Sequence, residues 1–184
     1  MRHLSVIAIL VGLLTAGCAG PTRAGETGAA KTPAVGPEAE VYVQVLRKYL
    51  GTPTDNSFPG KTFTTVYVLD RAFPDAADPS VRYEGGTPIG PDVQRHITAA
   101  LAPAHVVFVA DRNAVIETDD GCPQVRDGGI LITLGPADGD DREVRVAVNG
   151  FVACLGATWL TYVVRNEPGS GWRVTGTTGT MSIA

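Results

Sequence analysis

Residues that could carry out catalysis are few and widely spaced in this chain. The 184 residues contain three histidines and three cysteines. A hydrolytic site would have to combine Ser57, His96 and an acidic residue of the long loops, a combination that no spacing in the sequence suggests. There is no G-x-S-x-G motif around a serine, and no H-E-x-x-H or C-x-x-C motif that would bind zinc. The sequence therefore predicts no catalytic residue, no cofactor and no metal site, and a hydrolase is kept as an alternative interpretation.

The position of Cys18 indicates where the protein is located, unlike the positions of the histidines and serines above. It lies in LLTAGCAG, residues 13–20, directly after the apolar segment 4–14 and a basic start formed by Arg2 and His3. A segment of this length is typical of the core of a signal peptide. It is too short to span a membrane, which takes about 20 apolar residues.

Small residues directly before a cysteine resemble the lipobox of bacterial lipoproteins, with Thr15 where leucine is usual. This resemblance implies that residues 1–17 are removed as a signal peptide and that Cys18 carries acyl chains, which anchor the protein to the outer face of the cell membrane. The alternative is an ordinary secretory signal, cut at Ala16 or Ala19, in which Cys18 has no role.

Removal of the signal peptide leaves Cys122 and Cys154 as an even pair besides Cys18. In an oxidising compartment such a pair predicts a disulfide. Two buried free thiols are the alternative.

The region after Cys18 differs from the rest of the chain in composition. Residues 18–37 are rich in Gly, Pro, Ala and Thr and show no apolar periodicity, so they predict a flexible tether with an end-to-end distance of about 25 Å. Residues 38–184 have the length and apolar content of a single domain. The formal net charge is −4 and the basic residues form no run, which argues against nucleic acid as a partner.

Apolar spacing predicts two helices in this domain, 38–50 and 91–102, and two strands, 64–69 and 106–109. The last third predicts four more strands at 129–134, 143–153, 158–165 and 171–177. Short turns with the sequences PADGDD, CLGA and NEPGSG separate them. Turns this short join antiparallel neighbours, so these four runs predict a meander.

Two helices packed on a four-stranded antiparallel meander give an α+β fold. A helix followed by a bent meander resembles the cystatin-like and NTF2-like cone folds. That resemblance concerns the fold alone and implies no function.

The aromatic residues Trp159, Tyr162 and Trp172 fall in the last two predicted strands. Aromatic side chains on neighbouring strands pack across a hairpin. They would form either the core of the sheet or an aromatic face open to a ligand, and we take them as the candidate ligand face because cavities are the usual binding sites.

Three stretches, FPGKTFTTVYVLD, VRDGGILITLGP and CLGATWLTYVVRNEPGSGWRVTGTTG, are similar to those of a group of secreted or lipid-anchored proteins of GC-rich Gram-positive bacteria. The resemblance covers roughly residues 40–184. It implies a shared extracytoplasmic domain, but no activity and no catalytic residue.

The sequence thus predicts a lipid-anchored domain of the cell envelope that binds a small ligand or an envelope protein. A cell-envelope hydrolase and a structural accessory subunit without a site are the alternatives.

Overall fold

The computed structural model describes residues 36–58 and 60–184, which belong to one compact unit. The predicted signal peptide, Cys18 and the tether up to residue 35 lie outside the described residues.

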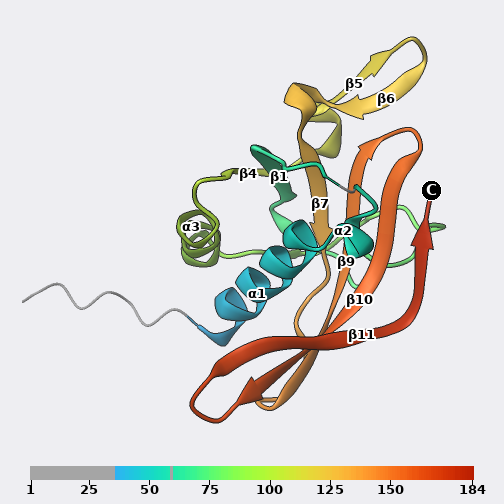
Figure 1. The fold of residues 1–184 in the computed structure, drawn as a ribbon. Coiled ribbons are helices and arrows are strands. Elements are labelled where there is room, and N and C mark those ends of the chain that lie inside the picture. Colours follow the sequence, from blue (N-terminus) through green and yellow to red (C-terminus); the bar gives the residue numbers. More distant parts are fainter. Residues whose placement is uncertain (1–35, 59) are drawn as a thin grey trace, which may run out of the picture. The chain divides into compact units, whose positions relative to one another are not determined.

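A mixed β-sheet of nine strands forms the framework (Figure 1). Its main path runs in the order β11–β10–β9–β7–β1–β4. The bounds of these strands are Gly171–Ile183, Gly156–Glu167, Glu143–Ala153, Ile130–Leu134, Thr65–Leu69 and His105–Val109, in that order. Strand β1 is parallel to both of its neighbours, β4 and β7, whereas β7, β9, β10 and β11 are antiparallel neighbours.

Shorter strands complete the fold. Strands β5 (Ile116–Asp119) and β6 (Cys122–Val125) form a hairpin that is joined to β9 through β6, and β8 (Asp138–Gly139) also pairs with β9. A separate pair consists of β2 (Arg71–Ala72) and β3 (Thr87–Pro88). The 3-10 turns η1 (Arg112–Ala114) and η2 (Arg126–Gly128) flank the β5–β6 hairpin.

Helix α1 (Pro37–Gly51) has the charge distribution that a helix dipole favours, with Glu38 and Glu40 in the first turn and Lys48 in the last. Helix α3 (Pro91–Ala100) begins with a proline, where a missing N–H costs no hydrogen bond. The single-turn helix α2 (Pro53–Asn56) follows α1 directly.

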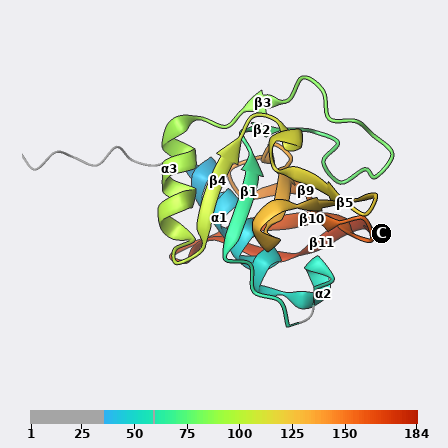
Figure 2. The same cartoon turned by 90° about the horizontal axis from the view of Figure 1, so that it is seen from above.

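The sheet curls into a half-barrel around α1 (Figures 1 and 2). Both α1 and α3 pack on this inner face, and the core between them and the sheet includes Tyr42, Leu46, Tyr49, Val68, Ile97, Ile132, Val146 and Tyr162. A second, smaller core lies on the outer face, where Tyr67, Leu69, Phe73, Val115, Val125 and Leu131 are buried together.

The predicted fold of two helices on a four-stranded meander is wrong. The four C-terminal strands are present, but they are part of a larger sheet to which β1 and β4 add a parallel β-α-β unit through α3. Four of the five residues of β1 are buried, as expected for a parallel strand that is covered on both faces. This parallel unit also distinguishes the sheet from the antiparallel cone that the sequence predicts. The region 110–128, which has no clear pattern in the sequence, contains the β5–β6 hairpin.

Candidate functional site

The candidate site lies where the chain leaves two neighbouring parallel strands. Strand β1 leads, through a long loop, to α3 on the inner face, whereas β4 leads to η1 and the β5–β6 hairpin, whose residues pack in the outer core. In sheets with parallel strands, ligands bind at the carboxyl ends of strands whose connections pass to opposite faces. A hollow opens at this place.

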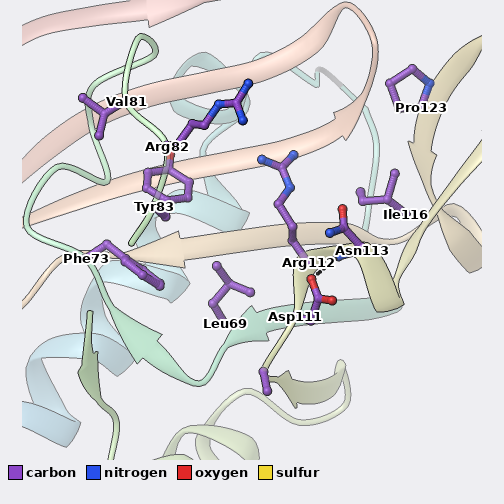
Figure 3. Close-up of a pocket in the computed structure, with 11 residues that line it drawn as sticks. Leu69, Phe73, Val81, Arg82, Tyr83, Asp111, Arg112, Asn113, Ile116 and Pro123 are labelled. Carbon is purple, nitrogen blue, oxygen red and sulfur yellow. Dashed lines mark hydrogen bonds between the residues drawn. The ribbon is translucent and has the colours of Figure 1, made fainter. Parts of the chain in front are cut away.

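This hollow, which we call the edge pocket, has a volume of about 570 Å³ (Figure 3). A volume of this size is within the range of small-molecule sites. Three short segments line it: the end of β1 with the loop after it, the residues after β4, and the β5–β6 hairpin. Its lining residues are Leu69, Phe73, Val81, Arg82, Tyr83, Ala110, Asp111, Arg112, Asn113, Ile116 and Pro123.

One part of the edge pocket is apolar and fixed in place. Leu69 and Phe73 are buried in the outer core, and the ring of Tyr83 packs on that of Phe73 at a centroid distance of 5.4 Å. The Tyr83 hydroxyl donates a hydrogen bond to the carbonyl of Ala76 at 3.2 Å. Burial raises the pKa of Tyr83, although Trp159 and Arg112 oppose that rise, so the phenol is neutral at physiological pH.

The other part of the edge pocket is basic. The guanidinium groups of Arg82 and Arg112 extend into the same space from opposite sides of the pocket (Figure 3). Within residues 36–58 and 60–184 neither of them has a carboxylate within ion-pair distance. The Arg112 guanidinium lies 5.6 Å from the ring centre of Phe151, a cation–π contact that helps to orient it.

Asp111, which also lines the edge pocket, forms no ion pair with either arginine among the described residues. Oδ1 of Asp111 accepts a hydrogen bond from the backbone N–H of Asn113 at 2.8 Å and so caps η1. The pocket therefore offers two guanidinium groups beside an apolar, aromatic surface.

The structure separates the three aromatic residues of the candidate ligand face. Tyr162 and Trp172 are buried in the inner core. Trp159 lies on the other face of β10, because side chains alternate along a strand. There it is close enough to Tyr83 to affect its pKa. Trp159 is thus a neighbour of the edge pocket, whereas the two other aromatic residues hold the core together.

The residues of the hydrolase interpretation are not joined into a catalytic arrangement in the described part of the chain. His96 Nε2 lies 3.5 Å from Glu40 Oε2, an exposed contact between α3 and α1. Ser57 ends α2 in a left-handed conformation with φ of 58°. No hydrogen bond between these two side chains occurs among the described residues. The same residues contain no group of three or more His, Cys, Asp or Glu side chains placed to hold a metal ion.

The predicted disulfide between Cys122 and Cys154 is confirmed, with a Cα–Cα distance of 5.5 Å. It ties the start of β6 to the turn that joins β9 to β10. Pro123, the neighbour of Cys122, lines the edge pocket. The bond therefore holds one wall of the pocket against the sheet.

Comparison of the chain with protein-family models, curated proteins and solved structures gives no match. Among the helices in the described ranges, none is long and apolar enough to cross a membrane.

Proposed function

We propose that this chain is a binding domain of the cell envelope that takes up a small ligand in the edge pocket and is held at the membrane by acyl chains on Cys18. The observation that carries the ligand part is the edge pocket itself. It is large enough for a small molecule, and it combines a fixed apolar surface with a few polar groups, the usual character of a ligand site.

The position of the edge pocket supports the same proposal. It lies at the carboxyl ends of β1 and β4, where backbone and side chains from three separate segments meet. The β5–β6 wall is covalently tied to the sheet, and a wall that is already ordered reduces the entropy lost on binding. The N-terminal segment supports the location, because a lipid on Cys18 and a tether would place the domain outside the membrane.

Native mass spectrometry of the protein, taken from its own membranes in mild detergent, tests this proposal. We expect a defined extra mass on the wild-type chain, which the variant Ile116→Trp loses because the larger side chain fills the edge pocket. Ile183→Trp is the matched control, since Ile183 also lies on a strand, is 62% exposed and does not line the pocket. A wild-type chain without an adduct, or an adduct that both variants retain, would contradict binding in this pocket. A wild-type chain found without an adduct would point instead to an envelope protein as the partner.

A further inference from the structure

We infer that the ligand of the edge pocket carries an oxyanion, a carboxylate or a phosphate, on an apolar ring-containing body, and that Arg82 and Arg112 hold the oxyanion between them. This inference rests on the proposed function and specifies its ligand class.

The edge pocket gathers positive charge. The whole chain has a formal net charge of −4, yet two guanidinium groups share this one hollow. Like charges repel each other, so the arrangement is more stable when an anion lies between them. A guanidinium remains charged at every physiological pH, and a bound anion would therefore be held across that whole range.

Two carboxylates near the arginines accept hydrogen bonds within their own turns. Asp111 caps η1, as described above. Asp78, which acts on Tyr83 through its charge, accepts hydrogen bonds from the backbone N–H and the hydroxyl of Ser80 at 2.8 and 2.6 Å. Among the described residues neither carboxylate lies within ion-pair distance of Arg82 or Arg112, so both guanidinium groups are available to a ligand.

The backbone places both arginines at the edge pocket. Arg82 directly precedes Tyr83, whose ring and hydroxyl are both fixed by contacts within the loop. Arg112 begins a capped turn and lies over the ring of Phe151. Planar guanidinium groups match the two oxygens of a carboxylate or the oxygens of a phosphate, and the guanidinium of Arg112 is already oriented by Phe151.

An apolar surface lies beside these charges. Leu69 and Phe73 are buried beneath it, whereas Val81, which is 39% exposed, and the half-buried ring of Tyr83 present apolar surface to the pocket. A ligand that is only an inorganic ion would leave this surface in contact with water. A ligand with a ring would cover it and contribute hydrophobic and aromatic contacts.

The test uses three probes that share one ring system: naphthalene-2-carboxylate, 2-naphthyl phosphate and naphthalene-2-carboxamide. Isothermal titration calorimetry at pH 7 and low salt should show that at least one of the anions binds the wild type about tenfold more tightly than the neutral amide, a difference of about 1.4 kcal/mol. The better of the two anions identifies the oxyanion as a carboxylate or a phosphate.

Substitution of the two arginines should remove this preference. In Arg82→Gln/Arg112→Gln the anions should bind only as well as the amide, whose own affinity should change less than about twofold. The matched control is Arg95→Gln/Arg165→Gln, which removes the same charge from two exposed positions outside the pocket. This control variant should still bind the anion more tightly than the amide, as the wild type does.

Three results would overturn the inference. Equal affinity of the wild type for all three probes would refute the oxyanion and leave the proposed function intact, because the pocket would still bind a ring. An equal loss of the preference in the control variant would show that only the overall charge matters. Binding of no probe would refute the inference and the proposed function together.

Discussion

The hydroxyl of Tyr162 donates a hydrogen bond to Asp55 Oδ2 at 2.7 Å and thereby joins the middle of β10 to helix α2. Tyr162 is fully buried in the inner core, while Asp55 is half-buried. A hydrogen bond to a carboxylate in such a place contributes more than one at the surface, since its loss leaves a charged group with one partner fewer. The pair therefore holds α2 against β10.

Replacement of Tyr162 by phenylalanine tests this role. We expect Tyr162→Phe to lower the free energy of unfolding by about 1–2 kcal/mol, as measured by urea unfolding and circular dichroism. Tyr67→Phe is the comparison, because the Tyr67 hydroxyl also donates to an aspartate at 2.7 Å and accepts from Arg126 Nε at 3.1 Å, but both partners are exposed, Asp127 by 66% and Arg126 by 48%. We expect the free energy of unfolding to fall by less in Tyr67→Phe than in Tyr162→Phe. Equal losses in the two variants would show that the position of Asp55 adds nothing.

The buried hydroxyl of Tyr49 makes stability depend on alkaline pH. Burial raises the pKa of Tyr49 to about 12, and its hydrogen bond with Thr158, at 2.5 Å, only partly offsets this rise. In the unfolded chain a tyrosine titrates at about 10. The unfolded state therefore releases its proton first as the pH rises. The stabilising contribution is complete below pH 10 and is lost between pH 10 and 12.

This loss should amount to about 1.4 kcal/mol per pH unit for Tyr49 alone. Urea unfolding at several pH values between 9 and 12 measures the slope, and Tyr49→Phe should make it shallower by about that amount. Tyr42 and Tyr162 also have raised pKa values because they are buried, so part of the slope should persist in the variant. An unchanged slope in Tyr49→Phe would contradict the assignment.

Most of the individual elements could be predicted from the sequence, but their assembly could not. The expected helix 38–50 is α1, Pro37–Gly51, and the expected strand 64–69 is β1, Thr65–Leu69. Periodicity and turn residues are local signals, and they locate elements well. The partner of a parallel strand is not encoded locally: β1 pairs with β4 and β7, which begin 40 and 65 residues later, at His105 and Ile130.

The candidate site could not be predicted from the sequence either, because its residues come from segments whose pairing is not encoded locally. Arg82 lies in a polar loop and Arg112 follows a short strand, 30 residues further on, and only the parallel pairing of β1 with β4 brings their segments together. The available signal was the position of Arg112 just after the carboxyl end of a strand, where parallel sheets bind ligands. Trp159, Tyr162 and Trp172 attract attention as large aromatic residues, but Tyr162 and Trp172 are buried in the core.

The disulfide should stabilise both the fold and the edge pocket. Cys122 and Cys154 are 32 residues apart in sequence, and closure of a loop of this size contributes about 3–4 kcal/mol through the entropy of the unfolded chain. Cys122→Ser/Cys154→Ser should lower the free energy of unfolding by up to this amount without reductant, and the wild type should approach the variant when reductant is added. Equal stability of both proteins without reductant would show that the bond contributes nothing.

The same double variant should also weaken the binding of the naphthalene probes, because the bond fixes the hairpin that carries Ile116 and Pro123. A wall that must become ordered on binding costs affinity, and we expect a loss of about two- to tenfold. Calorimetry well below the unfolding temperature of the variant separates this effect from loss of the fold. Unchanged affinity would show that the hairpin holds its position without the bond.

The anchor proposed at Cys18 can be tested apart from everything in the folded domain. Palmitate labelling in cells should mark the wild type and Cys122→Ala, which keeps the lipobox-like segment, but not Cys18→Ala. The last variant should also leave the membrane fraction, since the apolar segment 4–14 is much shorter than the roughly 20 residues that span a bilayer. Retention of Cys18→Ala in carbonate-washed membranes, or its continued labelling, would contradict lipidation at this residue. A wild type that carries no label and is found outside the membrane fraction would instead favour the secretory signal cut near Ala16 or Ala19, and the domain would then reach its ligand as a free protein outside the membrane.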